Sequence, residues 1–280
     1  MNIKLNKNSR KIEYTLINYS DKNYKKSQKL NTKTAISIGG FDRVISYSLK
    51  DIDLDFYYKN RNILHESKGA GYWLWKPYFI RKTFEYIDYG DYLFYCDSGC
   101  HFIDSIDKFI NSIDRKQDII PFELQDSEKK WTKRDTFVLM DCDNIKFTDT
   151  KQRLASYNLW KKTPFTIKFI DEWLTYALDK RILTDIENQC NKSNYDEFVE
   201  HRHDQSIFSL LSKKYNITAY RDPSQFGNRF IEEYPNSKYQ QLIKHTRQKD
   251  LSFYKSIKKK LRKVKFILII YNKIKKIYQK

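Results

Sequence analysis

The fold class is decided by one stretch of the sequence, Asp91-Tyr92-Leu93-Phe94-Tyr95-Cys96-Asp97-Ser98-Gly99. Its apolar run is typical of a buried strand, and the run ends in a carboxylate that a glycine soon follows. Open α/β sheets carry their ligand sites at the carboxyl ends of their strands. We therefore expect a strand that delivers Asp97 to the edge of a sheet where chemistry takes place.

A glycine-containing aromatic segment precedes that strand and reads Lys68-Gly69-Ala70-Gly71-Tyr72-Trp73-Leu74-Trp75-Lys76-Pro77. Glycines allow a tight turn, and the aromatic rings beside them can stack on a flat base or a sugar. The two lysines can neutralise a phosphate. The segment therefore favours a nucleotide-diphosphate ligand, although tryptophans at this spacing are at least as often core residues.

The remaining hydrophobic patterns predict strands and helices that alternate along the chain. Further strands are expected at residues 14–20, 118–122 and 214–220, and residues 35–40 together with 43–47 are expected to make one more strand or strand-turn. Helices are expected at residues 77–86, 133–140, 151–160, 165–179 and 203–213. Such alternation predicts an α/β fold in which helices flank a mainly parallel sheet.

A second polar cluster, His201-Arg202-His203-Asp204-Gln205-Ser206, opens one of these predicted helices. Asp204 and Gln205 fall in its first turn, where exposed amides and the positive helix end favour polar ligands. A carboxylate beside a carboxamide suits the hydroxyl groups of a sugar. The alternative is that Asp204 merely caps the helix and that the histidines lie at the surface. Zinc is disfavoured, because no third ligand stands at metal-site spacing.

Two other acidic segments compete with Asp97 as metal sites. Asp51-Ile52-Asp53-Leu54-Asp55 lies in a polar connection that no strand precedes, so it is interpreted as a solvated loop. Asp141-Cys142-Asp143 follows a predicted short helix, whose negative end disfavours carboxylates, and we expect both to stay in solvent. Asp97 is therefore the better candidate.

The composition favours one folded domain and a basic tail. The chain has 280 residues, of which 40% are hydrophobic and 16% aromatic, enough for one domain with a substantial core. Residues 251–280 hold eleven Lys or Arg and no Asp or Glu, out of a net charge of +18. The four cysteines form no CxxC pair and the first residues lack an apolar run, so we expect reduced thiols in the cytosol.

The tail, residues 251–280, is expected to form a basic amphipathic helix. Its apolar residues recur at steps of three and four, at Tyr254, Ile257, Leu261, Val264, Leu268 and Tyr271. The apolar run within it is too short to span a bilayer. We expect it to bind the anionic lipid of the cytoplasmic membrane face, with a coiled coil to a partner as the alternative.

Five motifs together resemble one family. They are Gly-Tyr-Trp-Leu-Trp-Lys-Pro at residues 71–77, Tyr-Cys-Asp-Ser-Gly at 95–99, Trp-Thr-Lys-Arg-Asp at 131–135, Gln-Arg-Leu-Ala-Ser at 152–156 and His-Asp-Gln-Ser at 203–206. In order and spacing, residues 12–230 resemble the bacterial surface-polysaccharide glycosyltransferases (capsule and lipopolysaccharide) of the GT-A fold. The resemblance implies a nucleotide sugar over the carboxyl ends of a Rossmann-like, mainly parallel sheet, in a catalytic domain of residues 1–250.

The resemblance also implies roles for the two polar clusters. Asp97 stands at the first position of an Asp-x-Asp motif that ligates Mn²⁺ or Mg²⁺ on the diphosphate. Gly99 stands at the second position, which is a departure from the motif and leaves one carboxylate for the metal. Asp204 and Gln205 are similar to an Asp-Gln pair that contacts the donor sugar on the reacting side. That similarity makes them the catalytic candidates and implies transfer with retention of anomeric configuration.

The remaining candidates follow from residue type. The diphosphate is expected to meet Tyr19, Lys76, Asp97, Lys133 and Arg134. The sugar or the acceptor is expected to meet Trp73, Ala155, Ser156 and His203.

The expected function is transfer of a hexose from a nucleoside-diphosphate sugar, with UDP favoured, to a cell-surface glycan precursor. The enzyme is expected to be cytoplasmic and peripheral on the inner face of the plasma membrane. One alternative is a non-enzymatic basic protein that binds membrane or nucleic acid. Nucleic acid is disfavoured, because the charge gathers at one end of the chain. Another is a sugar nucleotidyltransferase, which is disfavoured because no glycine-rich phosphate loop follows the first strand.

Overall fold

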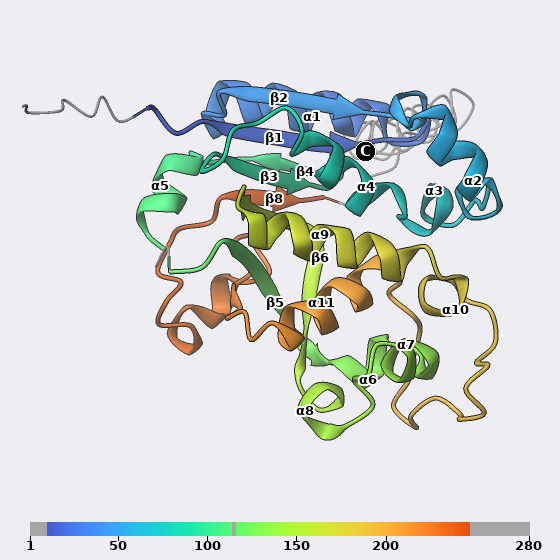
Figure 1. Cartoon of the computed structure of the whole chain (residues 1–280). Helices are drawn as coiled ribbons and strands as arrows, with labels where there is room; N and C mark the ends of the chain where they lie inside the picture. The colour runs from blue at the N-terminus through green and yellow to red at the C-terminus, as the bar shows by residue number, and fades with distance from the viewer. Residues whose placement is uncertain (1–9, 114–115, 247–280) are drawn as a thin grey trace, which may run out of the picture.

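The computed structural model describes residues 10–113 and 116–246, and Figure 1 shows their arrangement around one sheet. This sheet has six strands in the order β2-β1-β3-β6-β5-β7. β2, β1 and β3 are parallel, β6 runs antiparallel to both β3 and β5, and β7 is parallel to β5. Five strands therefore share one direction, which confirms the predicted α/β fold with a mainly parallel sheet.

The strands of the main sheet are β1 Tyr14–Tyr19, β2 Arg43–Tyr47, β3 Tyr92–Cys96, β5 Ile119–Ser127, β6 Lys151–Lys161 and β7 Tyr220–Arg221. A small antiparallel pair is formed by β4 Cys100–Phe102 and β8 Ile243–His245.

The helices include α1 Lys25–Thr34, α2 Leu54–Leu64, α3 Gly69–Tyr72, α4 Trp75–Thr83, α5 Ile106–Asn111, α6 Glu128–Trp131, α7 Arg134–Leu139, α8 Ile145–Thr148, α9 Pro164–Ala177, α10 Lys180–Leu183 and α11 Asp204–Lys214. The chain also forms the π-helix η1 Ala35–Gly39 and the 3-10 helices η2 Leu49–Asp51 and η3 Asn228–Glu233.

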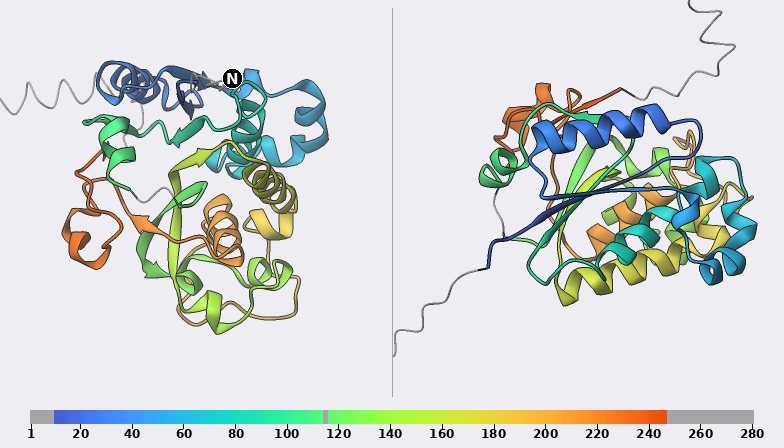
Figure 2. Two further views of the ribbon diagram at one scale, coloured as in Figure 1. Left: turned by 60° about the vertical axis from the view of Figure 1, so that its left-hand side comes forward. Right: turned by 90° about the horizontal axis from the view of Figure 1, so that it is seen from above.

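The central strand β3 is buried on both faces, which explains its uninterrupted apolar sequence. Leu93 and Tyr95 point into the core that includes residues of α4, α9 and α11. Phe94 and Cys96 point into the other core, toward Phe102 of β4. Figure 2 shows the corresponding layers, with α4 and α9 on one side of the sheet and α1 on the other. The strand thus ends at Cys96 with Asp97 directly behind it, as predicted.

Several further elements match their predictions closely. β1, β2 and the start of β5 lie where strands were expected, and α4, α7, α9 and α11 lie where helices were expected. α9 begins after Thr163, whose hydroxyl accepts a hydrogen bond from the Thr166 amide, and has a proline in its first turn. Such local signals are visible in the sequence.

The helix predicted at residues 151–160 is wrong, because this segment forms the eleven-residue strand β6. Its apolar residues Leu154, Ala155, Tyr157, Leu159 and Trp160 are all buried, on both faces of the sheet. A strand covered on both sides does not alternate apolar with polar residues, so its period cannot be distinguished from that of a buried helix.

The strand or strand-turn predicted at residues 35–40 and 43–47 is right only in its second part, which forms β2. Residues 35–39 form η1, which continues directly from α1, a helix that the sequence did not indicate. The side of α1 that packs on the protein consists of Gln28, Asn31 and Thr34, all buried. Asn31 donates to the Cys100 carbonyl (3.0 Å) and Gln28 to the Tyr47 carbonyl (2.8 Å). A helix whose buried face is polar has no apolar periodicity to detect.

The late strand predicted at residues 214–220 is largely wrong. α11 extends through Lys214, and only Tyr220 of that range is part of a strand, the two-residue β7. β7 pairs with only two residues of β5, Phe122 and Glu123. So short an edge strand has no period that a sequence pattern can show.

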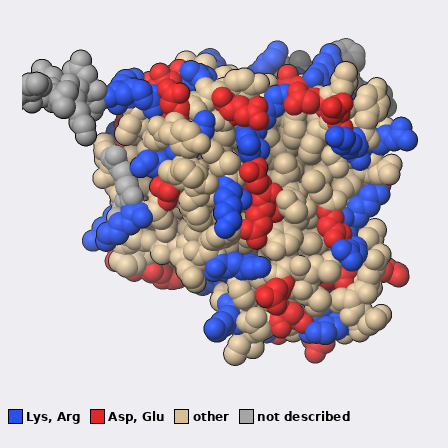
Figure 3. Space-filling view, in the orientation of Figure 1, with Lys and Arg blue, Asp and Glu red and all other residues tan. Residues whose placement is uncertain are grey.

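The described residues bear on the expectations for the cysteines and for a membrane span, but not on the expectation for the tail. All four cysteines lie within it and are free. Residues 10–113 and 116–246 contain no helix with the length and apolar character needed to cross a membrane. The predicted tail at 251–280 lies outside the described residues. The face seen in Figure 3 carries basic and acidic side chains interspersed.

Substitution of Gly71 tests the close approach between α3 and the end of α2. Gly71 has φ +99°, and a Cβ there would lie 2.8 Å from the backbone of Leu64, whereas Gly90 has φ +91° with open space around it. Gly71→Ala should lower the free energy of unfolding by at least about 2 kcal/mol, and Gly90→Ala by only about 1 kcal/mol, because only the first combines backbone strain with a clash. Urea denaturation measures both, and equal losses would contradict the role of the close approach.

Candidate active site

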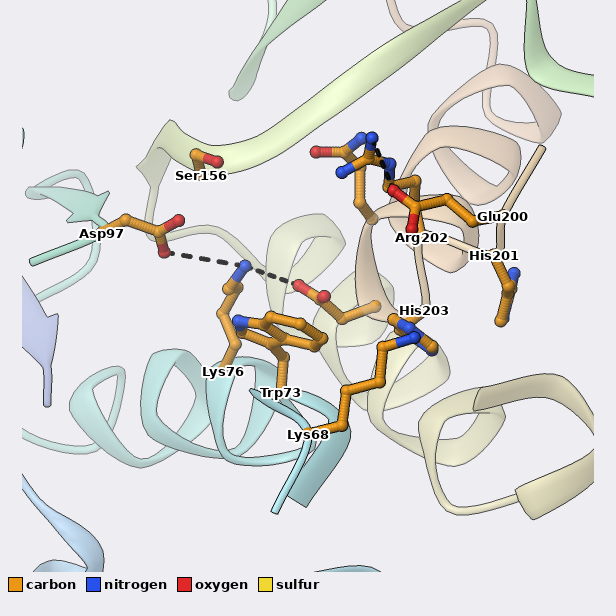
Figure 4. A pocket seen from close by; sticks show the side chains of 11 residues that line it. Lys68, Trp73, Lys76, Asp97, Ser156, Glu200, His201, Arg202 and His203 are labelled. Carbon is orange, nitrogen blue, oxygen red and sulfur yellow. Dashed lines mark ion pairs between the residues drawn. The ribbon is translucent and has the colours of Figure 1, made fainter. Parts of the chain in front are cut away.

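A pocket of about 260 Å³ opens where β3 and β6 approach the beginnings of α4 and α11. Seven of the predicted site residues line it, namely Trp73, Lys76, Asp97, Ser156, His203, Asp204 and Gln205. Figure 4 shows the lining residues converging from four separate parts of the chain. They also include Lys68, one of the two lysines predicted to neutralise a phosphate, and Glu200, His201 and Arg202, to which the sequence gave no role. The tertiary structure therefore brings the two predicted clusters into one cavity.

The turn before α4 places Lys76 inside the pocket. Ala70, Tyr72 and Trp73 all have positive φ, so the backbone turns sharply before α4 begins. The indole of Trp75 donates a hydrogen bond back to the Gly69 carbonyl (2.9 Å). Lys76 follows in the first turn of α4, and its side chain is only 3% exposed.

The ammonium group of Lys76 lies between two carboxylates. Its Nζ forms an ion pair with Asp204 Oδ2 at 2.6 Å and a longer one with Asp97 Oδ1 at 3.8 Å. Both contacts are marked in Figure 4. The ring of Tyr95 lies under Nζ at 5.1 Å, and its hydroxyl donates to Asp97. Asp97 is 27% exposed and Asp204 only 4%, so Asp97 is the carboxylate that solvent or a ligand reaches.

Burial gives Asp204 an unusual proton affinity. Loss of solvation raises the pKa of Asp204 from 3.8 to about 6, the charge of Asp97 adds to the rise, and the ammonium of Lys76 opposes it. Burial likewise raises the pKa of Tyr95 well above its ordinary value. The Tyr95 hydroxyl therefore stays protonated and acts as a donor to Asp97.

The pKa of Asp204 predicts a pH dependence of stability. Because the folded state binds this proton more tightly than the unfolded state, the wild-type protein should lose stability as the pH rises from about 4 to about 6. The free energy of unfolding of the wild type should fall by roughly 2–3 kcal/mol more than that of Asp204→Asn over this pH range. Urea denaturation of both proteins between pH 4 and 7 measures it, and a difference that does not change with pH would contradict the assignment.

Gln205 is held in one orientation by a chain of hydrogen bonds. The buried carboxylate of Glu128 can only accept, so Gln152 turns its Nε2 toward it (3.1 Å) and its Oε1 toward Gln205. Gln205 therefore donates through Nε2 to Gln152 (2.7 Å) and accepts at Oε1 from the amide of Ala155 (3.2 Å). One N–H and one lone pair of this amide are left for a ligand.

A second buried ion pair anchors this chain. Glu128 is fully buried and pairs with Lys213 of α11, whose pKa burial lowers while the carboxylate raises it. The hydroxyls of Thr132 and Ser209 also donate to Glu128 (2.8 and 2.6 Å). No sequence signal separates Glu128 from the many exposed acidic residues, so this support was missed.

Removing one charge of this pair should destabilise the protein. Glu128→Gln leaves Lys213 buried without its counter-charge and should lower the free energy of unfolding by about 3–5 kcal/mol. Glu128→Gln combined with Lys213→Met should recover most of that loss, since no unpaired charge remains. Thermal and urea unfolding of the four proteins test this, and strictly additive losses would contradict the coupling.

His203 forms one wall of the pocket together with Trp73. Their rings are stacked with centroids 5.4 Å apart. Burial lowers the pKa of His203 to about 4, so the ring is neutral at pH 7. Its Nδ1–H donates to the Leu183 carbonyl (2.8 Å), which leaves Nε2 as an acceptor. Nε2 is buried and has no hydrogen-bond partner among residues 10–113 and 116–246.

Lys133 and Arg134, predicted at the diphosphate, do not line the pocket. Lys133 is buried, where it donates to the Ile186 carbonyl (2.6 Å). Arg134 pairs with Asp143 (2.9 Å) and lies over the ring of Tyr195 (4.1 Å). The expectation that Asp143 stays in solvent is also wrong, since its side chain is 13% exposed. The arginine neutralises it, which outweighs the unfavourable helix end.

Tyr19 and Ala155 support the pocket without lining it. Tyr19 stacks on Trp75 with ring centroids 3.8 Å apart, and burial raises its pKa to about 12. Its carbonyl accepts the hydroxyl of Ser98 in the loop after Asp97. Ala155 acts through its amide on Gln205, while the next residue, Ser156, accepts the Asp97 amide with its carbonyl (2.7 Å).

Of the two carboxylates that contact Lys76, only Asp97 is accessible to a divalent metal. Across residues 10–113 and 116–246, no three His, Cys, Asp or Glu side chains gather as a metal site. Asp97 is the accessible carboxylate, and Gly99 offers no second one. Mg²⁺ and Mn²⁺ accept a single carboxylate when phosphate oxygens and water complete the shell. The residues therefore fit a metal held jointly by Asp97 and a bound diphosphate.

This chain is similar to solved structures of other proteins. The chain matches no family model and no curated protein sequence. Mouse xyloside xylosyltransferase 1 in its apo form is similar at 9% identity and a TM-score of 0.44, over 84% of this chain and 97% of that one. The apo structure of the bifunctional glycosyltransferase WbbM is similar at 10% identity and a TM-score of 0.42, over 71% and 37%. At these values neither similarity assigns an activity to this chain.

Proposed function

We propose that this protein is a glycosyltransferase that moves a hexose from a nucleoside-diphosphate sugar, with UDP the favoured nucleotide, to a glycan acceptor. One observation carries the proposal: the buried ammonium of Lys76, paired with Asp204 and Asp97 in a cavity lined by amide, hydroxyl and aromatic groups. The pocket lies at the carboxyl end of β3, where parallel sheets bind their ligands.

The site supplies what the departing diphosphate requires. When the bond between the sugar C1 and the phosphate oxygen breaks, its electron pair goes to that oxygen. The acceptor hydroxyl bonds to C1, and its proton goes to the departing phosphate oxygen. Lys76 offsets the developing negative charge, and the amides at the start of α11 favour an anion there. A metal held by Asp97 would add positive charge at the same phosphate.

The polar groups beside Asp204 suit the sugar. Gln205 has one N–H and one lone pair available, and the hydroxyl of Ser156 lies on the same wall. Asp204 is held against Lys76 on that side, so we assign it and Gln205 to the donor sugar, with retention of configuration. Trp73 offers a flat surface and His203 a buried acceptor atom for a sugar ring and its hydroxyls.

The acceptor proposed is a cell-surface glycan precursor of the kind built in capsule or lipopolysaccharide synthesis. The support for a membrane-linked precursor is the basic sequence of residues 251–280, which suits the anionic inner face of the plasma membrane. The rival function, a non-enzymatic basic binder of membrane or nucleic acid, gives no role to a buried carboxylate, ammonium and amide in one cavity.

Nucleotide binding and turnover test the proposal. UDP should raise the melting temperature, with a larger shift when Mn²⁺ is present, and UDP-hexoses should release UDP slowly even without acceptor. Asp97→Asn should abolish the release and weaken UDP binding. Gln205→Ala should reduce release by roughly 100-fold while leaving the Kd for UDP within about threefold, because its amide faces the sugar.

The matched control is Lys168→Ala, an exposed lysine on α9, which should change neither quantity. If no nucleoside diphosphate or nucleotide sugar shifts the melting temperature, the proposal is wrong. If Gln205→Ala instead loses UDP binding and keeps its turnover at saturation, the sugar and nucleotide ends of the pocket have been exchanged.

A further inference from the structure

α1 presents a basic face away from the protein. Its lysines Lys25, Lys29 and Lys33 are spaced by four residues and are exposed, so they share one side of the helix. The opposite side is buried through Gln28 and Asn31. Lys22 and Lys26 are exposed in the same segment, and residues 22–41 contain no Asp or Glu.

Aliphatic side chains accompany these lysines. Leu30 of α1 is 45% exposed, and Ile36 and Ile38 of the adjoining η1 are 62% and 44% exposed. Lysines with exposed aliphatic residues among them are typical of helices that lie in a membrane interface, with their apolar groups at the acyl boundary. The face seen in Figure 3, by contrast, mixes both signs of charge.

The described chain ends beside α1. Asn31 of α1 donates to the Cys100 carbonyl of β4 (3.0 Å), and β4 pairs with β8, the last strand described. The amide of Thr246 then donates to the Gly99 carbonyl (2.9 Å). Figure 2 shows α1 and β8 on the same side of the sheet. The described chain therefore ends near the buried side of α1, opposite its basic face.

We propose that this face, Lys22, Lys25, Lys26, Lys29 and Lys33 with Leu30, Ile36 and Ile38, docks on an anionic lipid bilayer. Charge complementarity selects the occupant: residues 251–280 carry eleven basic residues and no acid, so they repel this face, as the same face of a second copy would. Nucleic acid is disfavoured, because residues 22–41 have no arginine and the exposed apolar residues are aliphatic, unlike stacking platforms for bases.

The docked orientation would bring the pocket close to the lipid surface. α1 follows β1, and Asn31 also contacts the Asp97 carbonyl at 3.5 Å. Burial raises the pKa of Tyr24 at the start of α1, and the charges of Asp21 and Asp97 add to the rise. The membrane contact does not depend on the proposed chemistry, so it can be tested even if the enzymatic assignment fails.

The experiment is flotation of the full chain with vesicles of phosphatidylcholine containing 30–40% phosphatidylglycerol (roughly the anionic content at which basic surfaces bind). Lys25→Glu, Lys29→Glu and Lys33→Glu together should weaken binding at least tenfold. Lys59→Glu, Lys146→Glu and Lys168→Glu, which are exposed on α2, α8 and α9, make the same change in net charge and should weaken it less than threefold. Equal losses in the two triple variants, or unchanged binding in the first, would overturn the proposal.

A second variant separates a bilayer from other polyanions. Leu30→Gln with Ile36→Gln keeps every charge, so it should weaken vesicle binding at least threefold and leave binding to duplex DNA unchanged. If this variant binds vesicles as well as the wild type does, no apolar insertion takes place and the bilayer is not the occupant. Should the Lys→Glu triple fail to fold by circular dichroism, Lys25→Gln, Lys29→Gln and Lys33→Gln give the same comparison with half the charge change.

Discussion

The candidate site depends on the buried ion pair between Lys76 and Asp204. It connects the first turn of α4 to the first turn of α11, two helices that are separated by more than a hundred residues of sequence. Taking both charges out of water is costly, and the short contact repays that cost only while the two helix ends stay in register. The positions of Trp73, which precedes α4, and Gln205, which follows Asp204, are set by the same contact.

The antiparallel strand β6 provides the second constraint. It runs between β3 and β5 and supplies Gln152 to one hydrogen-bond chain and the Ser156 carbonyl to the Asp97 amide. Glu128, with its own buried partner Lys213, accepts a hydrogen bond from Gln152 and so fixes the orientation of the Gln152 and Gln205 side-chain amides. The pocket is therefore preorganised by one ion pair in its wall, Lys76 with Asp204, and by a second outside its lining, Glu128 with Lys213. This spares a bound ligand the cost of ordering these side chains.

α1 connects the site to the outer surface of the protein. Its buried side is polar, with Asn31 donating to the Asp97 and Cys100 carbonyls just after β3, and its exposed side is basic. Such a helix gains little from apolar burial, so its place is fixed by hydrogen bonds to the strands. This polarity explains why apolar periodicity did not reveal the helix.

The sequence by itself determined the α/β class, the central strand ending at Asp97, and both clusters that line the pocket. These are local properties, since an apolar run, a turn of glycines and a helix start depend on neighbouring residues. Only the tertiary structure decided that residues 151–161 form a strand, that Lys76 lies between Asp204 and Asp97, and that Lys133 and Arg134 are engaged elsewhere. Burial on both faces erases the strand period, and the partner of a charged side chain is chosen by distances that the linear order of residues does not contain.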